Sequence, residues 1–262
     1  MKPRSVLKRL AAATLKRVGF TYLRTEQRAG LEAGAATGEK SQMLGMVADA
    51  DLRRALALLP GSQSQLNQDL FVLSELGWKR GGFFVEFGAT DGKTLSNTWL
   101  LEKEFGWTGI LSEPARIWHA ALGASGRTAK IERDCVWSTT GETLQFTETD
   151  WAELSTISEF AASDAHNRKK ARSYRVRTVS LNDLLARHGA PAVMDYLSID
   201  TEGSEFRILE QLDFSRYRFR CITCEHNRQP VRDDIYRLLS AHGYRRKHVA
   251  LSDFDDWYVL PD

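Results

Sequence analysis

An apolar run that ends in a glycine turn constrains the fold of this chain more than any other segment. Residues 83–87 carry four apolar side chains out of five, which predicts a strand buried on both faces of a sheet. Gly88 and Gly92 follow, and their missing Cβ atoms predict a tight turn that lets a ligand approach the backbone. Apolar positions with helical spacing come next, over residues 95–105. A buried strand, a glycine turn and a helix form the opening unit of a nucleotide-binding α/β sheet.

Two acids beside this turn indicate the kind of nucleotide. A dinucleotide-binding turn has the spacing G-x-G-x-x-G and presents bare amides to a pyrophosphate, whereas this turn has only Gly88 and Gly92. Glu86 and Asp91 would repel a pyrophosphate at close range. Their charges suit the sulfonium and amino groups of S-adenosylmethionine. The alternatives are a turn that binds no ligand and, less consistent with the acids, a NAD-dependent oxidoreductase.

Length and composition bound the architecture. At 262 residues with 42% hydrophobic content, the chain can bury one large core, or a core with a small appendage. The formal net charge of +2 favours no class of partner. Cys135, Cys221 and Cys224 are too few, and odd in number, for a disulfide framework, which favours a reducing, cytoplasmic location. No apolar run approaches the roughly 18 residues of a transmembrane helix.

The N-terminal part differs in character from the rest. Residues 1–60 predict a basic, helical extension followed by a linker, because eight Lys or Arg residues and one acid occupy the first thirty positions. An amphipathic helix of this kind could rest on the inner face of an anionic membrane, and a solvated helix is the alternative. Residues 61–262 predict the main domain. Within it, residues 138–173 break the strand–helix rhythm and predict an insertion that could cover a substrate as a lid.

Polar side chains recur where the predicted strands end. Glu113 ends the second predicted strand, where nucleoside-binding folds hold ribose hydroxyls; capping of the next helix is the alternative. Asp134 and Cys135 lie in a third predicted strand, residues 129–137, whose end would meet the adenine edge.

The fourth and fifth predicted strands also end in polar residues. Residues 193–200 form the fourth predicted strand, which ends in Asp200 and is followed by Glu202; residues 219–224 form the fifth, which is followed by Glu225 and His226. The carboxyl ends of parallel strands form the edge of an open α/β sheet at which ligands bind. Five such strand ends in succession therefore predict a site at this edge.

These motifs resemble those of the FkbM family of methyltransferases. The resemblance rests on residues 84–92 (Phe-Val-Glu-Phe-Gly-Ala-Thr-Asp-Gly), on Glu113-Pro114 and on residues 200–205 (Asp-Thr-Glu-Gly-Ser-Glu), with support from residues 95–98 and 225–227. It covers the chain from about residue 65 onward. It implies an α/β class I methyltransferase fold, a Rossmann-like seven-stranded sheet with helices on both faces and the last strand antiparallel. It also implies S-adenosylmethionine as donor and O-methylation of a sugar, glycan or natural-product hydroxyl.

The resemblance assigns roles to individual residues. Glu86, Gly88, Ala89 and Asp91 would hold the methionine part of the cofactor, and Asn97 would also bind the cofactor. Glu113 would bind the ribose, and Asp134 with Cys135 would bind the adenine. Asp200 would lie where the transferred methyl group meets its acceptor.

A hydroxyl acceptor gains from losing its proton as the new bond forms, which calls for a base. His226 is the first candidate, because its pKa lies near neutral pH. Asp200 could serve instead or could orient the hydroxyl, with Glu202 beside it. The alternative is activation by Mg²⁺ at Asp200, Glu202, Glu225 and His226. Glu202 could instead merely favour the N-terminus of the following helix.

Two other functions remain open at this stage. The basic residues between positions 168 and 177 would suit an RNA methyltransferase. The motif typical of methylation at base amino groups is absent after the fourth strand, so a nucleic-acid substrate is the less favoured one. A non-catalytic docking module is the second alternative, although a scaffold has no need for acids at every strand end. The favoured acceptor is a small molecule or a glycan or lipid-linked hydroxyl.

Overall fold

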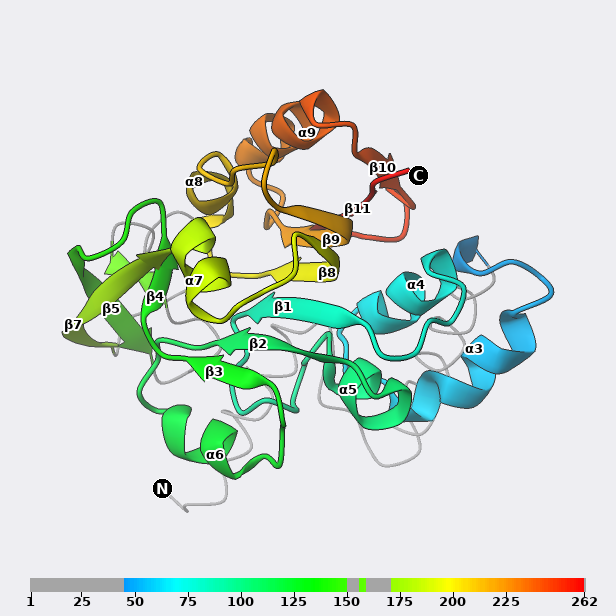
Figure 1. Ribbon diagram of the computed structural model, residues 1–262, viewed down its shortest axis with the longest axis horizontal. Coiled ribbons are helices and arrows are strands. Elements are labelled where there is room, and N and C mark those ends of the chain that lie inside the picture. Colours follow the sequence, from blue (N-terminus) through cyan, green and yellow to red (C-terminus); the bar gives the residue numbers. More distant parts are fainter. Residues whose placement is uncertain (1–44, 150–155, 159–170, 262) are drawn as a thin grey trace, which may run out of the picture. The chain divides into compact units, whose positions relative to one another are not determined.

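The computed structural model describes residues 45–149, 156–158 and 171–261. A seven-stranded sheet with the order β10-β11-β9-β8-β1-β2-β3 forms its centre (Figure 1). Its strands are β1 (Phe83–Phe87), β2 (Thr108–Ser112), β3 (Lys130–Glu132), β8 (Val193–Ile199), β9 (Arg218–Glu225), β10 (Arg245–Lys247) and β11 (Asp255–Val259). Only β11 runs antiparallel to its neighbours, β9 and β10. The predicted fold, with its antiparallel last strand, is thereby confirmed.

The apolar run that opens the domain becomes the central strand β1. Its neighbours are β2 and β8, both parallel to it, so that Phe84 lies between Gly109 and Tyr196. Phe84, Val85 and Phe87 are almost completely buried. A strand covered on both edges and both faces needs apolar side chains at nearly every position, which explains the absence of alternation in this segment.

Helices cover both faces of the sheet. Adjacent residues of a strand point to opposite faces of the sheet. The side chains of Trp257 and Tyr258 on β11 therefore lie on opposite faces, and their contacts show which helices cover each face. Tyr258 packs in the core with residues of α7 (Leu181–Arg187), α8 (Glu205–Leu209) and α9 (Val231–Ala241). On the other face, Trp257 stacks against Phe71 of α4 (Gln68–Glu75) with ring centroids 4.8 Å apart. The remaining helices are α3 (Leu52–Leu58), η1 (Leu59–Gly61), α5 (Trp99–Phe105) and α6 (His119–Ala124).

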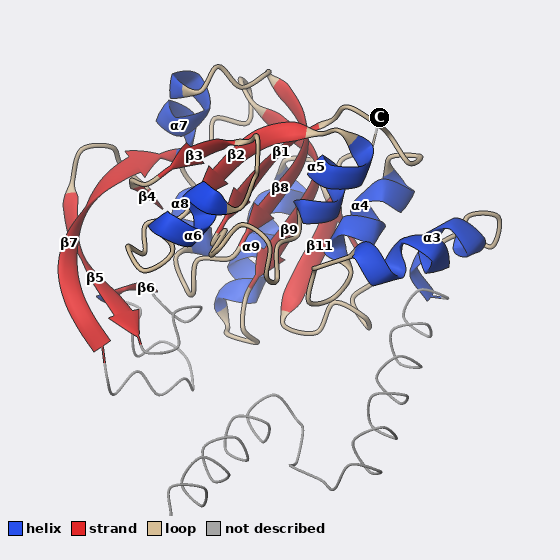
Figure 2. Ribbon diagram, turned by 90° about the horizontal axis from the view of Figure 1, so that it is seen from below, coloured by secondary structure: helices blue, strands red, loops and turns tan. Residues whose placement is uncertain are grey.

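A second, four-stranded sheet lies beyond the carboxyl ends of β1–β3 (Figures 1 and 2). Its order is β4-β7-β5-β6, from β4 (Cys135–Trp137), β5 (Thr143–Thr149), β6 (Thr156–Ile157) and β7 (Ala171–Ser180). A small core of its own includes Trp137, Phe146 and Val176. The predicted insertion is thus built, where described, as a sheet at the ligand edge; its role as a lid stays a prediction.

The prediction of one strand over residues 129–137 is wrong. The chain leaves the main sheet after β3 and enters the second sheet as β4. Between the two, Glu132 Oε1 accepts the backbone N–H groups of Arg133 and Asp134 at 2.9 and 3.0 Å. This side-chain acceptor replaces a neighbouring strand for those two amides, so the chain can turn.

The compact unit that contains the sheets comprises Met46–Asp262. Ala55 of α3 is buried in it. Most of the predicted basic extension, and with it the predicted membrane contact, falls in residues 1–44, outside the described residues. Within the described ranges, no helix is both long and apolar enough to cross a bilayer.

Candidate active site

Acids from three adjacent strands meet at the ligand edge of the main sheet. Phe87 pairs with Ile199, and Ile199 pairs with Cys224, so the residues that follow each strand come side by side. Asp200 after β8 therefore lies next to Glu225 at the end of β9. Asp255 begins β11 and pairs directly with Glu225, because an antiparallel strand starts at the edge where its parallel neighbour ends.

The glycine turn after β1 is pressed against the backbone of Asp200. Gly88 has φ = 74°, and a Cβ at this position would lie 2.3 Å from the carbonyl oxygen of Asp200. The N–H groups of Gly88 and Ala89 both donate to the carbonyl of Ser112, at 3.1 and 3.3 Å. Gly88 is thus required for close approach as well as for conformation, and the predicted residues Gly88 and Ala89 lie between the ends of β2 and β8.

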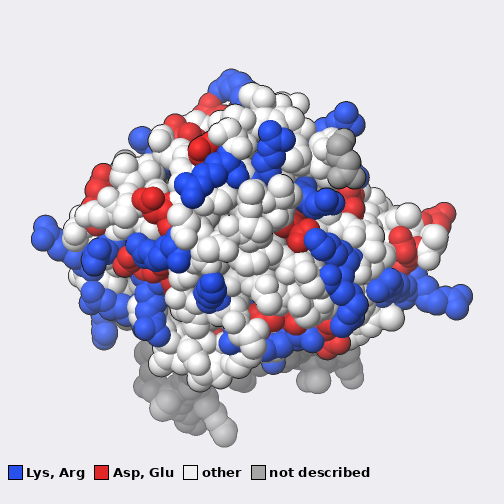
Figure 3. Space-filling view, in the orientation of Figure 1, with Lys and Arg blue, Asp and Glu red and all other residues white. Residues whose placement is uncertain are grey.

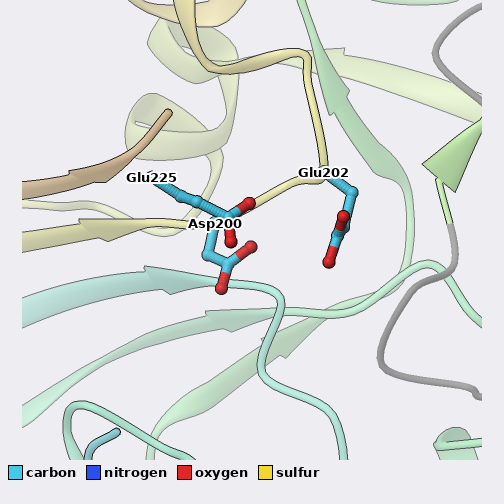
Figure 4. A group of neighbouring side chains, drawn as sticks. All are labelled: Asp200, Glu202 and Glu225. Carbon is cyan, nitrogen blue, oxygen red and sulfur yellow. The ribbon is translucent and has the colours of Figure 1, made fainter. Parts of the chain in front are cut away.

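Asp200, Glu202 and Glu225 form one group of carboxylates (Figure 4). One oxygen from each residue lies within 4.8 Å of the other two. Burial raises the pKa of Asp200, and burial together with the charges of Asp200 and Glu202 raises the pKa of Glu225 well above its usual range. The Asp200 and Glu225 side chains also form a hydrogen bond with each other. Two carboxyl groups that meet this way cannot both ionise freely, so burial and the neighbouring charge favour the protonated form of each.

The turn that carries Glu202 is held from two sides. Glu202 has φ = 59°, an unusual value for a residue with a side chain. Glu205 Oε1 accepts the N–H groups of Thr201 and Gly203, at 2.8 and 3.1 Å. Thr156 of the second sheet donates its hydroxyl to the carbonyls of Thr201 and Glu202, at 3.3 and 3.1 Å. The second sheet is therefore tied directly to the acidic turn.

His226 lies outside the group formed by Asp200, Glu202 and Glu225. Its Nδ1 accepts the N–H of Arg228 at 3.0 Å, and its Nε2 lies 3.7 Å from Asp256 Oδ1. Burial lowers the pKa of His226, although Asp256 partly opposes this. Asp256 itself binds Arg232 and Arg246. With one nitrogen accepting a backbone bond and the other beside Asp256, His226 is poorly placed to take a proton from an acceptor, and its role as base stays an unsupported prediction.

Glu86 organises the segment that follows the glycine turn. Its two oxygens accept the N–H of Asn97 at 2.7 Å, the hydroxyl of Ser96 at 2.9 Å, and the hydroxyl of Thr98. Burial raises the pKa of Glu86. Asn97 in turn donates through Nδ2 to Ser198 Oγ on β8 at 2.9 Å, while its Oδ1 is buried and has no hydrogen-bond partner among the described residues.

Asp91 stabilises the glycine turn itself. Its Oδ1 accepts the N–H groups of Lys93 and Thr94 at 2.8 and 2.7 Å, and its Oδ2 accepts the Thr94 hydroxyl at 2.8 Å. Burial would raise its pKa, but these hydrogen bonds outweigh it and lower the pKa. The turn keeps its shape through this side chain without a bound ligand.

Glu113 connects the turns after β1 and β2. Its Oε2 accepts the N–H of Thr90 and its Oε1 accepts the N–H of Ala115, both at 2.8 Å. Burial raises its pKa to about 7 in spite of these bonds. Each carboxylate oxygen retains a second lone pair, so the geometry leaves capacity for a ribose hydroxyl.

Asp134 and Cys135 fall where the chain passes to the second sheet. Asp134 Oδ2 accepts from Arg187 Nη1 at 3.1 Å. Cys135 lies in the core of the second sheet, and burial raises the pKa of its thiol to about 12. Cys135, Cys221 and Cys224 are all free and buried, as the cysteine count predicts. These contacts show no adenine-binding role for Asp134 or Cys135, which stays a prediction.

Two contributions to this site were missed in the sequence. Asp255 Oδ2 accepts from Gln68 Nε2 at 3.1 Å and from Trp257 Nε1 at 3.3 Å. Burial raises the pKa of Asp255 to about 8. Arg127 donates to Glu102, to the carbonyl of Gly92 and to the hydroxyl of Thr98, each at 2.7 Å. These bonds connect the end of the glycine turn to helix α5. The antiparallel direction of the last strand was a signal for Asp255; nothing in the sequence singles out Arg127.

Comparison with known proteins identifies one family. The sequence model of the methyltransferase FkbM domain matches residues 86–246, more than half of the chain. No curated protein matches the chain.

Several solved methyltransferase structures are similar to this chain. The FkbM methyltransferase from Methylobacillus flagellatus KT is 13% identical with a TM-score of 0.46, over 88% of this chain and 60% of its own. A putative RNA methyltransferase from Pyrococcus horikoshii is 13% identical with a TM-score of 0.35, over 73% and 79%. A TehB-like SAM-dependent methyltransferase from Corynebacterium glutamicum is 9% identical with a TM-score of 0.35, over 81% and 97%. The chain thus spans 60% of the length of the FkbM structure.

Proposed function

Because this chain belongs to the methyltransferase FkbM domain family, we propose that it transfers the methyl group of S-adenosylmethionine to a hydroxyl group. When bound, S-adenosylmethionine supplies a methyl group on a positively charged sulfur, which is a good leaving group. The favoured acceptor is a hydroxyl of a sugar, a glycan or a natural product, free or lipid-linked. The chain's own contribution is to bind both partners, to place them in line and to receive the acceptor proton.

The residues around the glycine turn fit this cofactor. Asn97 Oδ1 is a buried acceptor without a partner among the described residues, and the ammonium group of the cofactor's methionine part is a suitable donor. Gly88 is exposed although its neighbours are buried, so its backbone is accessible at the sheet edge. Glu113 has lone pairs left for ribose hydroxyls. We expect Asn97, Gly88 and Glu113 to hold the cofactor, with Asp91 and Glu86 shaping the turn rather than touching it.

Asp200 is the residue best placed to act on the acceptor. Its carbonyl touches the glycine turn, and its carboxyl group belongs to the acidic group that faces the same edge. It is partly exposed, while Glu202 and Glu225 are buried. We expect Asp200 to accept a hydrogen bond from the acceptor hydroxyl and to orient its oxygen. The proton released as the new bond forms can pass to the Asp200 carboxylate, because burial raises the pKa of this group and so favours its protonated form.

The contact between Gly88 and Asp200 is the observation that carries this proposal, because it joins the predicted cofactor turn to the predicted acceptor site. The test is to compare Asp200→Asn with the wild type. We expect calorimetry to show similar S-adenosylhomocysteine affinity for both. Radiolabelled methyl transfer to a panel of hydroxylated acceptors should fall by about 10²- to 10⁴-fold in the variant. Absence of S-adenosylhomocysteine binding to the wild type would contradict the cofactor assignment, and unchanged transfer by Asp200→Asn would contradict the role of Asp200.

The face of the molecule shown in Figure 3 gives little support to the RNA alternative. On the face shown in Figure 3, Lys and Arg side chains are scattered with acidic ones among them. Part of the basic run between residues 168 and 177 falls outside the described residues. A scaffold without catalysis would not need buried acids with raised pKa values at three adjacent strand ends, since such groups are unfavourable for stability. An enzyme that acts on a hydroxyl therefore accounts for more of the site.

A further inference from the structure

The acidic group at the sheet edge has the spacing of ligands to one ion. The carboxylate oxygens of Asp200, Glu202 and Glu225 lie within 4.8 Å of one another (Figure 4). Oxygen ligands lie about 2.0–2.1 Å from Mg²⁺, so two ligands are about 3 Å apart when adjacent and about 4.2 Å apart on opposite sides of the ion. The spacing of the three oxygens is close to this range.

A separate observation concerns two carboxylate oxygens beside this group that have no donor among the described residues. Glu225 is 8% exposed, and its Oε2 is buried without a hydrogen-bond partner among the described residues. Asp255 pairs with Glu225 across the two strands, which puts both side chains on the same side of the sheet. Asp255 Oδ1 is buried and has no partner there either. Two neighbouring carboxylate oxygens without donors are unfavourable unless a cation or a proton lies near them.

Three arginines among the described residues bind other acids. Arg232 and Arg246 bind Asp256, at 2.8 and 3.1 Å. Asp256 neighbours Asp255 along β11 and therefore points to the opposite face of the sheet. Arg127 binds Glu102 at 2.7 Å. The negative charge around Glu225 is thus not met by these side chains.

We propose that Asp200, Glu202 and Glu225 bind one divalent cation that prefers oxygen ligands, of the Mg²⁺ or Mn²⁺ class. His226 is not a ligand, because its Nδ1 accepts a backbone bond and its Nε2 lies beside Asp256. Asp255 contributes negative charge next to the ion.

The catalytic role of the cation rests on the proposed methyl transfer. The binding of the cation does not depend on that proposal. A cation at this place lowers the pKa of an acceptor hydroxyl lying beside it. The O–H bond breaks, the proton passes to the Asp200 carboxylate, and the electron pair stays on the oxygen that attacks the methyl carbon. The electron pair of the carbon–sulfur bond leaves with the sulfur, so charge and atoms balance.

Mn²⁺ is the probe that tests the site, since its binding can be followed by electron paramagnetic resonance and calorimetry without any acceptor. The full chain should bind one Mn²⁺, and Glu225→Gln and Glu202→Gln should each weaken binding by about 10- to 100-fold or more. Glu210→Gln, which changes an exposed acid after α8, is the matched control and should bind as the wild type does. Two ligand variants are used so that the test stands if one of them fails to fold.

Each outcome decides a separate question. Absence of Mn²⁺ binding to the wild type up to about 5 mM, beyond the weakest natural oxygen-ligand sites, would overturn the cation site. The proposal would also be overturned if both ligand variants bound Mn²⁺ as tightly as the wild type does. S-adenosylhomocysteine is titrated into the same samples. If the protein binds S-adenosylhomocysteine but not Mn²⁺, the proposed function stands and the cation site is excluded. If it binds Mn²⁺ but not S-adenosylhomocysteine, the cation site stands and the proposed function is contradicted.

Discussion

Gly88 shows how much of the site depends on single atoms. Gly88→Ala introduces a Cβ at φ = 74° that would lie 2.3 Å from the Asp200 carbonyl oxygen. Gly141 has φ = 89°, and a Cβ added there would have no atom within 4 Å, so Gly141→Ala carries the backbone cost without the collision. We expect Gly141→Ala to lose about 1 kcal/mol of unfolding free energy, and Gly88→Ala to lose more and to bind S-adenosylhomocysteine at least about tenfold more weakly. Urea unfolding and calorimetry measure both; equal effects of the two substitutions would show that the contact with Asp200 is unimportant.

Other residues show where sequence reasoning ends. Asp200 and Glu225 could be predicted, because their place at a strand end follows from the apolar run before them. The hydrogen bonds of Glu86 could not, since they depend on how residues 96–98 fold back over the strand. Arg127 is farther still from prediction: its partners Gly92, Ser96, Thr98 and Glu102 lie 25 or more residues before it in the chain, and no local pattern records the contacts. A role that depends on contacts between residues distant in the sequence cannot be predicted from the spacing of residues in a local motif.

At the scale of elements, the positions of the main strands along the chain were predictable, and their lengths were not. Buried parallel strands are apolar at most positions, which made β1, β8 and β9 recognisable in the sequence. The third strand was predicted too long because residues 133 and 134 find their hydrogen-bond acceptor in the Glu132 side chain instead of a neighbouring strand. The second sheet was predicted only as an irregular insertion. Its strands are stabilised by pairing with one another, as β5 does with β7, and such pairing cannot be inferred from one strand alone.

The contact between the second sheet and the acidic turn is a testable link between elements. Thr156→Val removes the hydroxyl that donates to Thr201 and Glu202 while keeping the shape of the side chain. One buried and one partly buried carbonyl then lose a donor, and we expect a loss of about 1–3 kcal/mol of unfolding free energy. The turn that carries Glu202 should also lose its position, so methyl transfer should fall while S-adenosylhomocysteine affinity stays unchanged. Thr156→Ser keeps the hydroxyl and should restore transfer; failure to do so would indicate that packing alone matters at this position.

The whole molecule carries a pH dependence that comes from buried acids. Asp69 is fully buried, and burial raises its pKa from 3.8 to about 6. Folding therefore favours the protonated form: the stability it contributes is complete below pH 3.8 and is lost as the pH rises through about 6. A rise of this size corresponds to about 3 kcal/mol. We expect Asp69→Asn to gain up to about 3 kcal/mol relative to the wild type between pH 4 and pH 7, measured by urea unfolding at both values. A constant difference between the two proteins would contradict the assignment to Asp69.

The pairing of β1 with β8 has a consequence for how this protein is made. Phe84 pairs with Tyr196, which is synthesised 112 residues later (196 − 84). At about 5–20 residues per second, translation takes roughly 5–20 s to cover that distance. During this time β2 can pair with one side of β1, but the other side of a strand with the sequence Phe-Phe-Val-Glu-Phe waits without a partner. An apolar strand with an open edge attracts other chains. The nascent protein should therefore depend on chaperones at the ribosome until residues 193–199 emerge, and the second sheet, which is encoded between the two strands, lengthens that wait.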